Sequence, residues 1–516
     1  MRRAIAFALT AFLCALPAVA GAFTVSGRFL YEDRVWNKDG YTGQVQNLPI
    51  RRAKVEVVNL VGGLALATGA TDTAGSYSLS VTGQVLPVSF YVRCTADATP
   101  AGYHIKVYDN FVRVPTVKIV TTGGILYAIS TDTTLAHPPA NNINKGTFLI
   151  KDLDGNGVAQ AFNILDCGID FWDWMATPEL MGTLPTENDS LIYAWKPLGS
   201  PGNAISNFGS NYSMQGIYIG ADTTDTDGWS DTVILHETGH WYDDLFSGEN
   251  NPGGEHFIGD NDADVLLAYG EGAATYHCAK VREYRAFHHS NLIGQPIDDH
   301  VSIYGDLTIP PPVGTSGGLS FGYDFETGNF TDGTPIGQRG SANETNVTTA
   351  LWDLMDGPET PDETPGADDD AMSVSDSYAW NIEHNHLRNL SANITVEDYY
   401  QGWFLLNGPG FLKSQVDQVF LTLAQMPWHT DSFEPDNTLA TAKPLTIQPH
   451  TATVGHMVIS ELDLGPQDCV ELYNASPAPV DMTGWQIQVY VNDDTQQQVS
   501  RVYVFDSFTI LPGDAL

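Results

Sequence analysis

The spacing of apolar residues changes twice along this chain, and these changes divide it into three regions. Residues 23–115 contain short stretches in which apolar and polar side chains alternate, for example Ala53–Val58 and Tyr77–Val81, and this alternation predicts β-strands. Helical spacing dominates residues 116–430, and strand spacing returns in residues 456–516. Because 516 residues are too many for one ordinary hydrophobic core, we expect a multidomain protein in which two β-sandwich domains flank a central α+β domain.

The central region should contain several helices separated by long loops rich in Gly, Pro and Asp. The acidic segment 356–376 has no apolar period, which predicts a solvated loop, and the polar, proline-containing residues 431–455 predict a linker. The helical spacings fall at Ala161–Met175, Ser230–Phe246, Val265–Val281, Thr345–Met355 and Leu412–Met426.

The first 22 residues have the composition of an export signal. Arg2 and Arg3 precede an apolar run of about a dozen residues, and small residues near Ala22 fit a cleavage site. The run is too short to span a bilayer, and no later stretch approaches the roughly 20 apolar residues that a spanning helix needs. We therefore expect a secreted protein without a transmembrane segment, acting as a monomer.

Charge and cysteine content narrow the classes of partner. The chain has 62 acidic and 23 basic residues, and such a negative surface argues against nucleic acid and anionic membranes as partners. Removal of the signal leaves Cys94, Cys167, Cys278 and Cys469. No disulfide framework follows, because four thiols in a chain of this size can equally be buried and reduced, although Cys167 and Cys278 would be the expected pair if one formed.

The most informative segment is the pattern H-E-x-x-H at residues 236–240. On a helix, His236 and His240 lie one turn apart on the same face, so both imidazoles can reach one ion at about 2.0–2.1 Å. Glu237 is then free to act as general base toward the water on that ion. The pattern predicts a zinc site rather than two solvated histidines.

The surrounding residues favour a buried helix. Apolar Val233, Ile234 and Leu235 immediately precede the motif, and Ser230 can cap the helix N-terminus. Gly239 lowers helix propensity by about 1 kcal/mol relative to Ala, which makes sense if another segment approaches the backbone there.

A catalytic zinc ion needs a third protein ligand. The metzincin extension is excluded because Asp243 and Phe246 occupy the positions where it requires Gly and His. Glu271 is the single carboxylate of an apolar helical stretch, where it is costly unless it is paired or bound to metal. The E-G-x-A pattern of Glu271–Ala274 after an H-E-x-x-H helix resembles the gluzincin peptidases, and this resemblance implies a zincin-like domain with Glu271 as third ligand. The rival ligands left open lie in the preceding loop and are His256, Asp260, Asp262 and Asp264.

Other residues are candidates for supporting roles. Asp243 could hold the imidazole of a ligand, and Thr275, one turn after Glu271, could bond to that carboxylate. The resemblance implies that strand Gly216–Gly220 pairs with substrate, and that Asn343 and Glu344 line the cleft. The candidate oxyanion donors are Tyr242, Tyr269, Tyr276, His384 and His386.

A calcium site is the second candidate for metal binding. Asp152, Asp154 and Asn156 match the first half of a calcium loop, but the twelfth position is Asn163 rather than Glu. The segment therefore predicts either a Ca²⁺ site or an ordinary turn.

The two flanking regions resemble known β-sandwich families. A Pro49-Ile-x-x-Ala-x-Val-x-Val57 strand followed by a T-D-x-x-G-x-Y turn at 71–77 resembles the prealbumin-like (carboxypeptidase regulatory-like) domain. Segments Val458–Leu462, Cys469–Asn474 and Val480–Trp485 resemble the lamin-tail domain, an immunoglobulin-like sandwich. Such a domain has strands beyond those present before Leu516, so we expect it to be truncated.

These features predict a secreted zinc metallopeptidase of gluzincin type, acting on protein or peptide substrates. Glu237 would take a proton from the attacking water and hand it to the leaving amine. The alternative is an exported adhesion or binding protein that keeps a zincin fold without activity, or a zinc hydrolase that cleaves another kind of bond.

Overall fold

The structure is a computed structural model that describes most of the chain in two compact units, 1–427 and 428–516. The signal sequence before Gly21 and the predicted linker at 431–455 lie outside the described residues. Among the described residues, no helix combines the length and apolar character that a membrane span requires. The described residues are 21–426 and 457–510 with gaps at 38–39, 110–123, 152–157, 187–188, 196–209, 214–215, 222–225, 249, 255, 257, 260–263, 289–300, 305–312, 318–320, 326–327, 331, 338, 356–371, 373, 391–393, 409, 464–468, 475–478, 482–485, 494–495 and 505–508.

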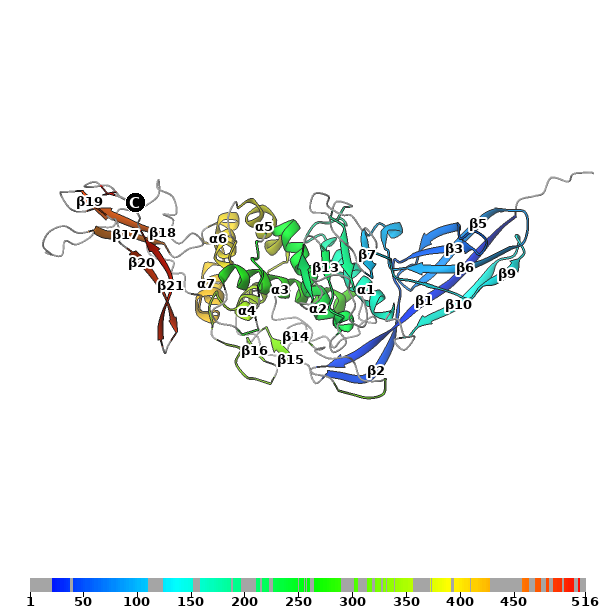
Figure 1. Cartoon of the computed structure of the whole chain (residues 1–516), viewed down its shortest axis with the longest axis horizontal. Coiled ribbons are helices and arrows are strands. Elements are labelled where there is room, and N and C mark those ends of the chain that lie inside the picture. Colours follow the sequence, from blue (N-terminus) through cyan, green and yellow to red (C-terminus); the bar gives the residue numbers. More distant parts are fainter. Residues whose placement is uncertain are drawn as a thin grey trace, which may run out of the picture. The chain divides into compact units, whose positions relative to one another are not determined.

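The N-terminal part of the first unit consists of two β-sheets whose apolar faces share one core (Figure 1). Strand alternation is clear in Ser76–Gln84, where buried and exposed side chains alternate, as a strand with one solvated face requires. In the first sheet β1 (Gly21–Asn37) pairs with β2 (Gly40–Pro49), β5 (Ser76–Gln84) and β10 (Ile143–Ile150). The second sheet contains β3 (Lys54–Asn59), β4 (Ala65–Ala70), β6 (Val88–Thr95), β8 (Ala128–Ser130) and β9 (Thr134–His137).

The turn before β5 explains one glycine of the T-D-x-x-G-x-Y pattern. Gly75 has φ +75°, and a Cβ there would lie 2.3 Å from the carbonyl oxygen of Phe29. Asp72 accepts backbone hydrogen bonds from Ala74 and Ser76 at 2.9 and 2.8 Å, which closes the turn. A side chain at position 75 would meet both strain and a clash.

The boundary expected at residue 115 is not where the strand-rich region ends. β8, β9 and β10 all follow residue 115 and pair with β6 or β1. Conversely, β7 (Ile105–Tyr108) lies before it but pairs with β11 (Leu191–Ala194), in a sheet with β13 (Gly216–Tyr218) and β12 (Asn211–Ser213). Strand alternation marks strands but carries no information about which sheet each strand joins.

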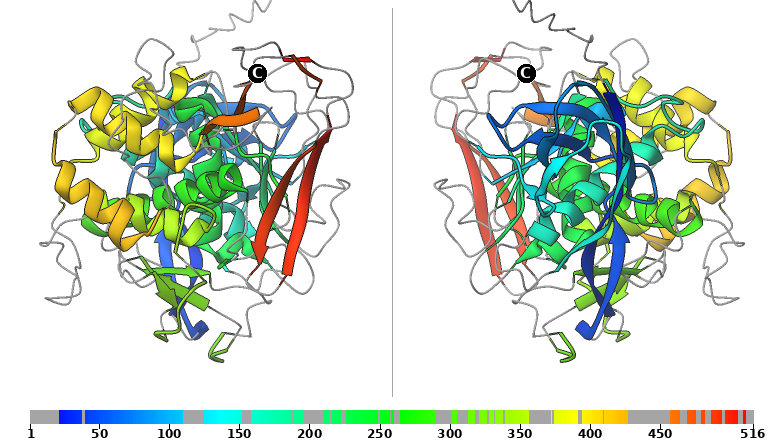
Figure 2. Two further views of the ribbon diagram at one scale, coloured as in Figure 1. Left: turned by 90° about the vertical axis from the view of Figure 1, so that its left-hand side faces the viewer. Right: turned by 90° about the vertical axis from the view of Figure 1, so that its right-hand side faces the viewer.

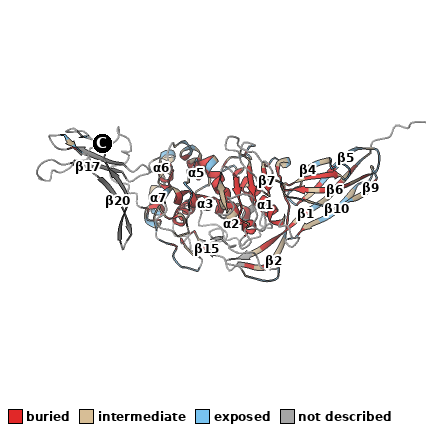
Figure 3. Ribbon diagram, viewed as in Figure 1, coloured by how far each residue is buried: buried red, intermediate tan, exposed pale blue. Residues whose placement is uncertain are grey.

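Helices dominate the rest of the first unit, and three of them carry the candidate site. α1 (Val158–Met175), α2 (Asp231–Tyr242) and α3 (Val265–His288) consist largely of buried residues where side chains are described (Figure 3). α4 (Glu344–Met355) packs against α3, and α5 (Ser377–Asn385), α6 (Val396–Asn407) and α7 (Lys413–Asp417) follow (Figures 1 and 2). Five of these helices fall where apolar spacing predicts them, whereas α5 and α6 were not predicted. Shorter elements are η1 (Thr99–Ala101), η5 (Asp227–Trp229), η6 (Asp243–Ser247), η8 (Leu387–Asn389), η9 (Gln418–Leu423), β14 (Val301–Tyr304), β15 (Phe321–Asp324) and β16 (Asn329–Phe330).

A buried ionic network ties the N-terminal strands to these helices. Arg51, just after β2, donates to Asp166 at 2.6 Å and to Asp170 at 2.8 Å, both on α1. Arg285 of α3 pairs with Asp170 and, at 2.5 Å, with Asp231 at the start of α2. All five side chains are almost fully buried, so each charge depends on its partners.

The second unit contains three antiparallel strand pairs in the residues that the structure describes. β17 (Met457–Asp463) pairs with β18 (Cys469–Asn474), and β20 (Gln486–Asp493) pairs with β21 (Gln496–Val504). β19 (Val480–Asp481) pairs with β22 (Thr509–Ile510). The chain therefore combines β-sheet regions with a mixed helical region, as expected for a multidomain α+β protein.

Candidate metal centre

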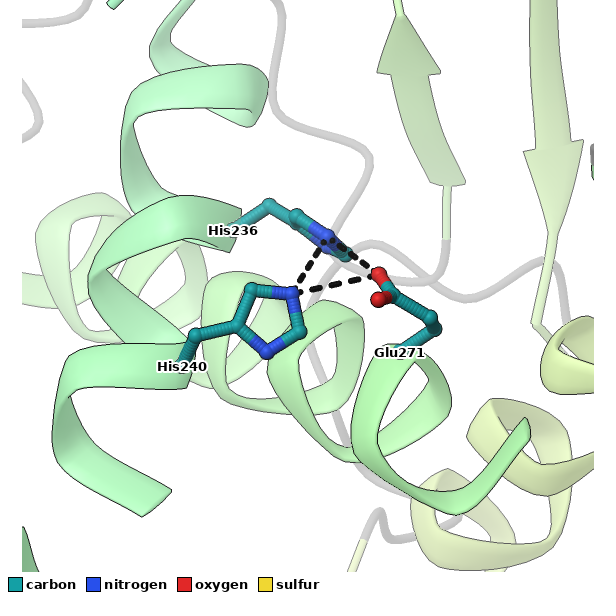
Figure 4. Close-up of side chains that lie close together, drawn as sticks. All are labelled: His236, His240 and Glu271. Atoms are coloured by element: carbon teal, nitrogen blue, oxygen red, sulfur yellow. Dashed lines mark hydrogen bonds and ion pairs between the residues drawn. The ribbon is translucent and has the colours of Figure 1, made fainter. Parts of the chain in front are cut away.

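Helix α2 presents the H-E-x-x-H residues from a buried position. Ser230 caps the helix, because its hydroxyl accepts a hydrogen bond from the backbone of Val233 at 3.4 Å. Ile234 and Leu235 are fully buried and hold one side of the helix in the core. His236 and His240 point from the other side toward α3 (Figure 4).

Glycine sets the distance between α2 and α3. A Cβ at Gly239 would lie 2.7 Å from both the Cα and the carbonyl oxygen of Ala274, so the two backbones touch there. On α3, a Cβ at Gly272 would lie 2.7 Å from the carbonyl oxygen of Glu344 and from Cβ of Val347. Small residues thus let α3 fit closely between α2 and α4. Gly239 had predicted such a close approach of another segment to the backbone of α2.

Three predicted ligands converge between α2 and α3. His236 Nε2 lies 3.0 Å from Glu271 Oε2, His240 Nε2 lies 3.1 Å from the same oxygen, and the two imidazole nitrogens are 3.2 Å apart (Figure 4). For ligands about 2.0–2.1 Å from a tetrahedral zinc ion, neighbouring ligand atoms are about 3.3–3.4 Å apart. The triangle has nearly this size, so the residues present fit a zinc ion.

The protonation states of these groups also suit a cation. Burial lowers the pKa of His236, which favours the neutral imidazole that binds metals. Burial alone would raise the pKa of Glu271, but the imidazoles of His240, His236 and His256 hold it well below its usual range. Burial therefore favours a neutral nitrogen at His236, and the neighbouring imidazoles favour an ionised carboxylate at Glu271.

Two further side chains orient the ligands. Thr275 Oγ1 lies 2.9 Å from His236 Nδ1, so Thr275 contacts this imidazole. Its spacing on α3 had predicted a contact with Glu271. Asn251 donates to Glu271 Oε1 at 2.9 Å. We did not predict a role for Asn251 from the sequence, although its amide lies in the loop between the two helices that carry the candidate ligands. Such bonds fix the orientation of ligand side chains.

Glu237 is buried beside the cluster without belonging to it, with 8% of its surface exposed. Burial raises its pKa to about 8, the charges of Glu271 and Asp227 act in the same direction, and His240 opposes them. A nearby cation would favour the ionised form. Glu237 is thus a carboxylate whose proton affinity depends strongly on the charge beside it.

Asp243, Tyr276 and His384 do not contact the cluster. Asp243 begins the π-helical turn η6, and its Oδ2 lies 3.6 Å from His277 Nδ1. Tyr276 is five residues after Glu271 and therefore on another face of α3, where it is buried beside His277. His384 stacks on Trp380 with ring centroids 4.7 Å apart. None of the three expected roles at the ligands is supported.

His277 forms a second buried group that sequence reasoning missed. Its Nε2 lies 3.0 Å from Glu383 Oε1, and Tyr242 donates to the other oxygen of Glu383 at 2.6 Å. Burial opposes the charged imidazolium, but Asp243 and Glu383 outweigh it and raise the pKa of His277 to about 10. This imidazolium links α3 to η6 and α5.

The rival third ligands occupy different places. His256 Nε2 lies 3.4 Å from Glu271 Oε2 and 3.7 Å from Glu344 Oε2, at the edge of the cluster. Asp264 is exposed and caps α3 by accepting from the backbone of Leu266 at 2.9 Å. Asp260 and Asp262 lie outside the described residues.

The calcium and cysteine predictions have different outcomes. Asp152, Asp154 and Asn156 lie outside the described residues, while Asn163, the twelfth position of that loop, is buried and donates to Asp231 at 2.9 Å. Cys167 and Cys278 are both buried free thiols, so the pairing considered for them does not occur. Each sulfur instead contacts an oxygen of α2, from Asp231 and Thr232 respectively.

Comparison with known proteins identifies one domain. Residues 450–516 match the Lamin Tail Domain family, which confirms the prediction for the C-terminal strands. No curated protein matches the chain. A 9R-lipoxygenase from Cyanothece PCC8801 is a structural match at 11% identity, covering 34% of this chain and 27% of that one, but its TM-score of 0.15 is too low to indicate a shared fold.

Proposed function

We propose that this chain is a zinc-dependent peptidase whose ion is held by His236, His240 and Glu271. The observation that carries the proposal is the triangle of ligand atoms, with sides of 3.0, 3.1 and 3.2 Å, on two helices in contact. Two imidazoles and a carboxylate are the donors of many catalytic zinc sites, in which three protein ligands leave a position for water. When bound, zinc would lower the pKa of that water and polarise the scissile carbonyl.

Glu237 has the position and chemistry of the general base. It adjoins His236 in the chain, is buried, and is not itself part of the triangle of ligand atoms. Its carboxylate would accept the proton of the attacking water and deliver it to the leaving amine nitrogen. Thr275 and Asn251 would hold His236 and Glu271 in place during this exchange.

The wider proposal extends to fold, location and substrate. The H-E-x-x-H helix and the Glu271 helix support a zincin-like domain of gluzincin type, and the T-D-x-x-G-x-Y turn supports a prealbumin-like N-terminal sandwich. The signal-like residues 1–22 support export from the cell, and the net charge of −39 favours protein or peptide substrates over nucleic acid.

The test combines zinc content with cleavage of unfolded casein by the full chain. We expect wild type to bind zinc and cleave casein, and Glu237→Gln to keep the zinc and lose cleavage by at least about a hundredfold. His384→Gln is the matched control, since His384 belongs to neither group of possible metal ligands and stacks on Trp380, and it should keep both properties. Zinc without cleavage in wild type would favour another substrate or an inactive binding protein, and absence of zinc would refute the site.

A further inference from the structure

A second group of metal-binding side chains shares Glu271 with the first. The ligand atoms of His256, Glu271 and Glu344 all lie within 4.8 Å of one another. His256 Nε2 is 3.4 Å from Glu271 Oε2 and 3.7 Å from Glu344 Oε2. With bonds of about 2.0–2.1 Å, these separations correspond to ligand–metal–ligand angles of about 110–130°.

The loop before α3 orients His256 for such a role. His256 Nδ1 lies 3.2 Å from the carbonyl oxygen of Gly254 and donates to it, which leaves Nε2 facing Glu271 and Glu344. Gly253 and Gly254 have φ of +63° and +140°, which lets the chain turn back toward the site. Asn251 holds the start of this loop, since it accepts from the backbone of Gly253 at 2.8 Å and donates to Glu271.

The charge of the site favours more than one cation. The carboxylates of Glu271 and Glu344 belong to the second group, and that of Glu237 is buried beside the first. The side chains of Glu271 and Glu344 are only 7% and 13% exposed, so water solvates their charges poorly. A divalent ion beside both carboxylates would compensate this buried negative charge.

We propose that His256 and Glu344 bind a second divalent transition-metal ion, with Glu271 bridging it to the zinc of the first site. The second ion belongs to the class that accepts mixed nitrogen and oxygen ligands, such as Zn²⁺, Mn²⁺ or Co²⁺, rather than Ca²⁺. Carboxylate-bridged ions of this kind lie about 3.5–4 Å apart in two-metal hydrolases. This inference rests on the proposed function, because Glu271 is a ligand in both sites.

The test counts the zinc ions that the full chain retains after chelation, reloading with Zn²⁺ and desalting. Wild type should retain two ions per chain, and His256→Ala and Glu344→Gln should each retain one. His384→Ala, which removes an imidazole outside the site, should still retain two. Glu344→Gln preserves side-chain shape, so it remains informative if His256→Ala fails to fold.

The other outcomes separate the two proposals. One ion in wild type, His256→Ala and Glu344→Gln alike would refute the second site and leave the first intact. If wild type retains one ion and His256→Ala retains none, His256 is a ligand of a single ion. This outcome also refutes the second site. Two ions unaffected by either variant would place the second ion elsewhere, and no retained ion would refute both proposals.

Discussion

At the scale of single residues, the proposed ligands are held by side chains outside the ligand set. Thr275 Oγ1 contacts Nδ1 of His236, so it fixes which nitrogen of that imidazole faces the site. Helical spacing indicated that Thr275 and Glu271 share a face of α3, but it could not show which partner on α2 would lie opposite. Contacts between helices depend on their crossing geometry, which local sequence does not determine.

Replacement of Thr275 by Val should weaken zinc binding without unfolding the protein. Val has nearly the same shape but cannot bond to Nδ1, and loss of such an outer contact typically lowers metal affinity about 10–100-fold. Competition with a chromophoric chelator measures this change. Thr349→Val is the matched control, because the Thr349 hydroxyl bonds only to the carbonyl of Thr345 in its own helix. Equal affinities in the two variants would contradict the prediction.

The buried imidazolium of His277 should make stability depend on pH. Its folded pKa of about 10 lies above the unfolded value of about 6.5, so its contribution is complete below about pH 6.5 and is lost as pH rises through 10. Removing one partner of a buried ion pair costs about 3–5 kcal/mol. We therefore expect His277→Asn to lower the free energy of unfolding by about that much at pH 6, and by much less above pH 10. Urea unfolding at both pH values tests this, and a pH-independent difference would show that His277 is neutral.

At the scale of elements, the close contact of α2 and α3 determines whether a site exists. The two helices bring together residues 236–240 and Glu271, and Gly239 permits this by its lack of a side chain. Gly239 was a visible anomaly in a helix, so the sequence showed that something approaches there. The sequence did not show that this segment is Ala274, on the same helix as Glu271, the proposed third ligand.

Gly239→Ala should separate the helices and damage the site. The new Cβ would lie 2.7 Å from two backbone atoms of Ala274, which cannot move aside as a flexible side chain could. We expect a loss of about 1–3 kcal/mol in the free energy of unfolding, as for other overpacked cores, together with weaker zinc binding. Thermal unfolding and chelator competition measure the two effects. Gly410→Ala, where a Cβ would meet nothing within 4 Å, should change neither.

At the scale of the whole molecule, the first unit does not divide at residue 115. Arg51 enters the core of the helical region and pairs with Asp166 and Asp170, while β7 forms an edge of the sheet that continues through β11 and β13. The strands before residue 115 are therefore part of the structure that supports α1 and α2.

A fragment of residues 116–430 should consequently fail to fold. It would lack β7 and leave two buried carboxylates without Arg51, a loss of at least about 3–5 kcal/mol. We expect residues 21–427 to unfold in one cooperative thermal transition and the shorter fragment to show none. Cooperative unfolding of residues 116–430 near the same temperature would show that the N-terminal sheets are an independent domain.

The sequence by itself determined the local features of this protein. Apolar spacing located five helices and several strands, the H-E-x-x-H pattern placed two imidazoles on one helical face, and the C-terminal signatures identified the lamin-tail region. Each of these depends on residues close together in the chain, whose geometry follows from regular backbone structure.

Which distant residues meet depends on the packing of the folded chain. It brought Glu271 to His236 and His240, added His256 and Glu344 at the edge of that cluster, and turned Asp243 toward His277 instead. It also joined β8–β10 to the N-terminal sheets and β7 to the central one. These contacts arise from side-chain packing and buried charge pairing between elements far apart in the chain. Neither packing nor charge pairing produces a periodic pattern in the sequence.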